Sequence, residues 1–135
     1  MHLIGAGPLA PDGEPEIIAV RTPHIGGIVQ AWRVVGDRLE LAATTEGYSS
    51  HQLGSANLDM ALLADVDGDG RLDVVVPTQD HRALGLLIRT TDGFEELDRL
   101  TLVGELATNV AATHTATGDL VLAAGTADGR LHFFR

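Results

Sequence analysis

Nine consecutive residues, 65–73, carry the strongest chemical signal in this chain. They read Asp-Val-Asp-Gly-Asp-Gly-Arg-Leu-Asp, with carboxylates at positions 1, 3, 5 and 9 of the segment. A hard cation such as Ca²⁺ takes roughly six to eight oxygen ligands, which are usually carboxylates, carbonyls and water. The glycine at position 6 permits the sharp turn that directs the later ligands back toward the ion. The spacing therefore predicts a calcium-binding loop.

The predicted calcium ligands are four carboxylates and one backbone carbonyl: Asp65, Asp67, Asp69, Asp73 and the carbonyl of Arg71. Mg²⁺ is a poorer match, because it prefers a tight octahedron and keeps several of its waters. The alternative is an Asp/Gly-rich turn that holds no ion. Carboxylates this close raise each other's pKa, so the spacing favours a bound cation.

The residues around the loop distinguish it from an EF-hand. An EF-hand loop ends in a bidentate Glu at position 12 and lies between two helices. Position 12 here is Val76, within a Val-Val-Val-Pro run at 74–77, and a short, mostly apolar segment precedes the loop at 58–64. β-Branched runs that end at proline are typical of strands. The sequence therefore predicts that a strand lies on each side of the ion loop.

This strand–DxDxDGxxD–strand pattern, over residues 62–76, resembles the FG-GAP or VCBS repeat. That repeat is the blade unit of calcium-binding β-propellers such as the head of integrin alpha subunits. The resemblance covers one blade. It implies a metal site formed by Asp65, Asp67, Asp69, the Arg71 carbonyl and Asp73, with a structural role for the ion.

The chain also matches itself at an offset of 57 residues, which places Asp12 on Asp69 and Glu16 on Asp73. The first two units are each expected to hold four strands, and a shorter third unit is expected to hold three. The expected strands are near 2–9, 16–21, 27–35 and 38–45, then near 58–65, 72–77, 83–90 and 94–103. In the third unit, residues 108–111 match the start of the second unit, and strands are expected at 119–124 and 130–134.

Repeats of roughly 50 residues with four antiparallel strands are typical of propeller blades. We therefore predict an all-β fold without substantial helices, with blade 1 at 1–57, blade 2 at 58–108 and an incomplete blade 3 at 109–135. A β-sandwich is the alternative architecture. Alternation predicts that Ile17, Ala19, Val74 and Val76 share one blade face and that Ile18 and Val75 share the other; Trp32 is expected to pack between blades. Such a partial propeller would be the C-terminal arc of a larger ring, or a protomer that closes by self-association.

Composition narrows the possible partners. The net charge of −10 disfavours nucleic acid, and no apolar run reaches the roughly 18 residues of a membrane helix. Cysteine is absent, so neither disulfides nor thiolate metal sites are expected. Since free Ca²⁺ is abundant mainly outside the cytoplasm, a periplasmic, secreted or cell-surface location is expected.

A second set of residues is expected on the loop surface opposite the ion site: His24, Tyr48, His51, His81 and Arg82. They would serve either a non-enzymatic module that binds a protein or carbohydrate, or part of a propeller lyase or hydrolase. The alternative is that they are ordinary polar loop residues without a shared ligand. No HExxH or GxSxG motif favours the enzyme. The loop of blade 1, at 8–16, keeps only two of the four carboxylates and is expected to hold no ion.

Overall fold

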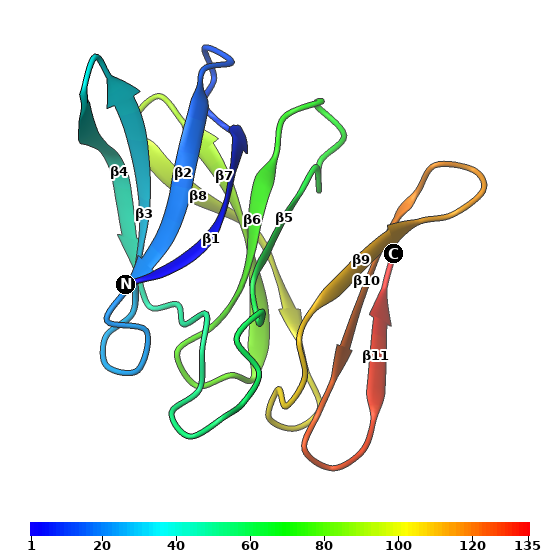
Figure 1. Cartoon of the computed structure of the whole chain (residues 1–135). Helices are drawn as coiled ribbons and strands as arrows, with labels where there is room; N and C mark the ends of the chain where they lie inside the picture. Colours follow the sequence, from blue (N-terminus) through cyan, green and yellow to red (C-terminus); the bar gives the residue numbers. More distant parts are fainter.

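The computed structural model describes all 135 residues as eleven strands without a helix (Figure 1). They form three antiparallel sheets of four, four and three strands, and in each sheet neighbouring strands follow the order of the chain. Sheet 1 comprises β1 (His2–Pro8), β2 (Pro15–Arg21), β3 (Ile28–Val35) and β4 (Arg38–Glu46). Sheet 2 comprises β5 (Leu62–Ala64), β6 (Asp73–Pro77), β7 (Ala83–Thr90) and β8 (Gly93–Thr101). Sheet 3 comprises β9 (Ala111–His114), β10 (Leu120–Gly125) and β11 (Leu131–Phe134).

The all-β prediction and the expected strand count are therefore confirmed. Sheet 2 lies between the other two, as Figure 1 shows, and no sheet closes on itself. None of the elements is a long apolar helix of the kind that crosses a membrane.

Strand register reproduces the 57-residue offset. Gly7 of β1 lies opposite Glu16 of β2, and Ala64 of β5 lies opposite Asp73 of β6. The segments 9–14 and 65–72 therefore connect the first two strands of their sheets at the same structural position. The sequence match between the units thus reflects a real similarity in pairing.

Two hydrophobic cores hold the sheets together. Val74 and Val76 of β6 pack with Ile18 and Val20 of β2 in the core between sheets 1 and 2. Val75, on the opposite face of β6, belongs to the core that includes Leu84, Leu86, Leu122 and Ala124 between sheets 2 and 3. This alternation, in which successive side chains point to opposite faces, confirms the predicted facing of these valines.

The connections between sheets also repeat. After sheet 1 the chain passes the end of sheet 2, where the Ser49 amide donates to the carbonyl of Pro77 at 2.8 Å. After sheet 2 the Ala107 amide donates to the carbonyl of Gly125 of sheet 3 at 2.9 Å. Each linker is therefore fastened to the second strand of the following sheet, which fixes the spacing of the sheets.

Trp32 does not pack between two sheets as predicted. It lines an apolar hollow with Ile17 and Leu39 on the face of sheet 1 that points away from sheet 2. The reason is register: Trp32 pairs with Ile17, and both side chains lie on the face opposite Ile18. Neither of the other two sheets covers that face.

Candidate metal centre

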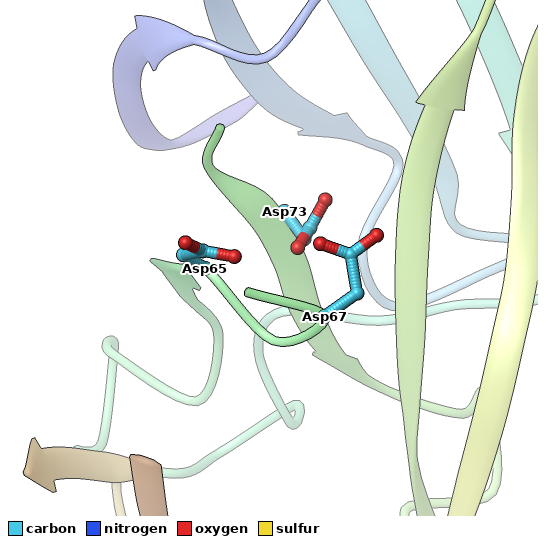
Figure 2. A group of neighbouring side chains, drawn as sticks. All are labelled: Asp65, Asp67 and Asp73. Carbon is cyan, nitrogen blue, oxygen red and sulfur yellow. The ribbon is translucent and has the colours of Figure 1, made fainter. Parts of the chain in front are cut away.

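Three of the four predicted aspartates converge in the loop between β5 and β6. One carboxylate oxygen of each of Asp65, Asp67 and Asp73 lies within 4.8 Å of the others. Figure 2 shows the three side chains around a common point, with Asp73 at the start of β6 and the other two on the loop. The cluster therefore combines a rigid strand position with two loop positions.

Backbone hydrogen bonds to the aspartates shape this loop. The Asp65 carboxylate accepts the amides of Gly68 at 2.7 Å and Gly70 at 2.9 Å, and Asp67 accepts the amide of Asp69 at 3.0 Å. Gly68 and Gly70 have φ angles of 78° and 87°, a region that side chains with a Cβ disfavour. The two glycines thus allow the chain to curl around the carboxylates.

Asp73 is the least solvated member of the cluster. Its exposure is only 2%, and its Oδ2 accepts the Val66 amide at 2.9 Å. Burial, with smaller contributions from the charges of Asp67, Asp69 and Asp65, raises the pKa of Asp73 to about 6. A cation next to this carboxylate would offset both causes, because an opposite charge favours the ionised form.

Asp69, the remaining predicted carboxylate, points to Arg71. The Arg71 amide donates to Asp69 Oδ1 at 2.8 Å, and its guanidinium Nε donates to Oδ2 at 2.8 Å. These contacts hold the pKa of Asp69 below its usual value. The same guanidinium donates to the carbonyls of Leu9 and Arg89, which ties the loop to sheet 1 and to β7.

The donor set fits a hard divalent cation. Three carboxylates within 4.8 Å of one another offer oxygen ligands only, as Ca²⁺ and Mg²⁺ prefer over nitrogen or sulfur. The structure thus brings together Asp65, Asp67 and Asp73, and places Asp69 with Arg71 beside them.

The equivalent loop of sheet 1 is neutralised by arginine. Arg33 Nη1 and Nη2 donate to the Asp12 carboxylate at 2.8 and 3.0 Å, and Arg33 Nε donates to Glu16 at 3.0 Å. Arg89 of sheet 2 donates to Glu16 through Nε at 2.8 Å and Nη2 at 2.9 Å. Guanidinium groups therefore balance the two carboxylates that remain at this position.

Sequence reasoning missed the roles of Arg33 and Arg89. The offset of 57 residues placed Asp12 and Glu16 at ligand positions of a loop that was expected to hold no ion. Two neighbouring carboxylates without an ion need a positively charged partner. Nothing in the local pattern identified which arginines supply it, because both come from third strands of their sheets.

The predicted residues of the opposite loop surface differ in burial and in contacts. His24 and His51 pack edge to face, with ring centroids 4.8 Å apart. Tyr48 lies in the core between sheets 1 and 2 with 6% exposure, and its hydroxyl donates to Glu96. His81 is also buried.

Arg82 follows the buried His81 directly in the chain but is itself exposed. It lines an open hollow of about 480 Å³ together with Asp80, Gln79 and Arg99, and none of the three histidines contributes to that hollow. Comparisons of the chain with family models, curated proteins and solved structures found no match.

Proposed function

We propose that this chain is a calcium-stabilised β-propeller repeat module that acts as a non-enzymatic binding or scaffold domain. The convergence of Asp65, Asp67 and Asp73 in the β5–β6 loop carries the proposal. In this view Ca²⁺ binds these three carboxylates, and Asp69, the Arg71 carbonyl and water complete the coordination. Asp69 would then exchange part of its contact with Arg71 for the ion.

The role of the ion is structural. The loop joins β5 to β6, so an ion held from both ends links the first strand of sheet 2 to the second. Binding to the folded state alone stabilises it by about 2.7 kcal/mol when the free ion exceeds its dissociation constant a hundredfold. With most of its ligands supplied by the protein, the ion is suited to hold the loop rather than to activate a substrate.

The propeller assignment rests on the repeated sheet. Sheets 1 and 2 share their strand order and the register of their first two strands, and each sheet packs face to face on the next. β1 contacts β5 and β4 contacts β8, so matching strands lie beside each other. This is the relation between neighbouring propeller blades, and it agrees with the FG-GAP or VCBS resemblance.

The burial of Tyr48 and His81, and the absence of the histidines from the hollow that Arg82 lines, favour binding over catalysis. The ligand is accordingly a protein or a carbohydrate held by surface loops. An extracytoplasmic location agrees with the calcium site, since modules outside the cytoplasm work at roughly 10⁻⁴–10⁻³ M Ca²⁺.

Thermal melting with Ca²⁺ and with EGTA tests the metal site. We expect Ca²⁺ to raise the melting temperature of the wild type and Mg²⁺ to raise it less. Asp67→Ala should abolish the calcium effect; Asp67 is a better choice than Asp69, which also holds Arg71. Asp37→Ala is the matched control, because Asp37 lies in the β3–β4 turn with a side chain that is 97% exposed.

The control should respond to Ca²⁺ as the wild type does. Identical melting temperatures for the wild type in Ca²⁺ and EGTA would contradict the proposed metal site.

A further inference from the structure

The two ends of the row of sheets expose apolar faces. On sheet 1, Leu3 is 65% exposed and Leu39 is 55% exposed. On sheet 3, Leu131 and Phe133 are each 69% exposed. Sheet 2 lies between these ends (Figure 1), so the two faces do not cover each other within one chain.

Register shows what kind of surface sheet 3 exposes. Leu131 and Phe133 pair with Gly125 and Ala123 of β10, just as Leu84 and Leu86 pair with Pro77 and Val75 of β6. Leu84 and Leu86 are only 0% and 8% exposed, because sheet 3 packs over them. The open face of sheet 3 is therefore equivalent to the face that sheet 2 turns toward its following neighbour.

The open face of sheet 1 is equivalent to the face of sheet 2 that packs against sheet 1. Ile17 pairs with Trp32 as Val74 pairs with Leu87. Val74 and Leu87 are 0% and 1% exposed, because they pack against sheet 1. The molecule thus contains two examples of one kind of contact, and its two open ends are the two halves of a third.

The open face of sheet 1 also has a hollow that fits an aromatic ring. The hollow has a volume of about 170 Å³, and its lining is entirely apolar: Met1, Leu3, Ile17, Ala19, Trp32 and Leu39. A dry apolar cavity of roughly 150 Å³ accepts benzene. Phe133 is an exposed aromatic side chain on the complementary face.

We infer that sheet 3 of one copy packs on sheet 1 of a second copy, with Phe133 entering the hollow beside Trp32. The reciprocal contact between the same two copies closes a ring of six sheets with twofold symmetry. Six lies within the usual range of roughly four to eight blades. The inference rests on the blade arrangement of the proposed function and does not depend on calcium.

The partner at both open faces is a second copy of the chain, because the chain already contains two interfaces of this kind, one between sheets 1 and 2 and one between sheets 2 and 3. Sheet 1 already accepts the apolar face of a sheet from this chain, and sheet 3 already packs on one. Burying Phe133 and Leu131 on one side, and Leu3 and Leu39 on the other, would remove from water the large apolar side chains exposed at both ends.

Sedimentation and light scattering on the 135-residue chain test this inference. The wild type should be a dimer in Ca²⁺, and dilution should shift the emission of Trp32, the single tryptophan, to longer wavelength. Phe133→Asp and Leu39→Asp should each raise the dissociation constant at least about a hundredfold, because each places an unpaired carboxylate in both contacts. Ile25→Asp is the control, since Ile25 is 84% exposed in the β2–β3 loop.

Mixing the two variants distinguishes a head-to-tail contact from other dimers. The Phe133→Asp protein keeps an intact sheet 1 face and the Leu39→Asp protein keeps an intact sheet 3 face, so the mixture should form a heterodimer with one good contact. Circular dichroism confirms that each variant is folded.

A monomeric wild type would overturn the inference while leaving the calcium melting results unaffected. A dimer disrupted by only one of the two substitutions, or a mixture that stays monomeric, would overturn it as well.

Discussion

Replacing Asp73 by Asn should stabilise the metal-free protein and also abolish its response to calcium. Asp73 is almost fully buried, and burial together with three neighbouring aspartates raises its pKa to about 6. The folded-state pKa is then above that of the unfolded chain. The resulting penalty is absent below about pH 4, grows between pH 4 and pH 6, and is fully present above pH 6.

The size of the effect follows from the shift in pKa. A rise from the ordinary 3.8 to about 6 is near two units. At about 1.4 kcal/mol per unit, ionised Asp73 costs up to about 3 kcal/mol at pH 7.5. The asparagine carbonyl can still accept the Val66 amide, so most of this cost should disappear. For a chain of this size, the melting temperature should rise by roughly 5–10 °C.

The assay is thermal melting of both proteins at pH 7.5, in EGTA and in Ca²⁺. In EGTA the Asp73→Asn protein should melt above the wild type. In Ca²⁺ only the wild type should gain stability, because the variant lacks a charged ligand. Asp37→Asn removes an exposed charge and should match the wild type in both conditions. If Asp73→Asn melts at or below the wild type in EGTA, the account of a strained, buried carboxylate is refuted.

Two further predictions concern stability away from the metal loop. Glu16→Ala should lower the free energy of unfolding by about 3–5 kcal/mol, because it leaves the buried guanidinium of Arg89 without its partner. The double change Glu16→Leu/Arg89→Leu removes both charges and should recover most of the loss. Urea unfolding measures both, and a double variant no better than the single one would contradict the prediction. Burial lowers the pKa of His81, although the charges of Glu105 and Asp80 act in the opposite direction. The unfolded chain therefore binds a proton at a higher pH than the folded chain does. The free energy of unfolding should fall as the pH drops below about 6.5. Urea midpoints at pH 7.5 and pH 5 should differ less for His81→Asn than for the wild type, and equal differences would show that His81 does not titrate in this way.

Features that depend on spacing along the chain were predictable from the sequence. The alternation of Val74, Val75 and Val76 placed them on opposite faces of a strand, because successive side chains of a strand point to opposite sides. The spacing of Asp65, Asp67 and Asp73 placed three carboxylates at the connection between β5 and β6, because residues within nine positions around a tight turn stay close in space. Short-range backbone geometry is enough to fix both relations.

Contacts between distant segments were decided only by the tertiary structure. Glu16 binds Arg89, which is 73 residues away. The Arg71 guanidinium, which holds Asp69, also reaches the distant carbonyls of Leu9 and Arg89. Tyr48 is buried because the linker after sheet 1 crosses the end of sheet 2, and Trp32 faces outward because register pairs it with Ile17. Each of these outcomes depends on how one sheet packs on another, and the period of a single strand carries no information about that packing.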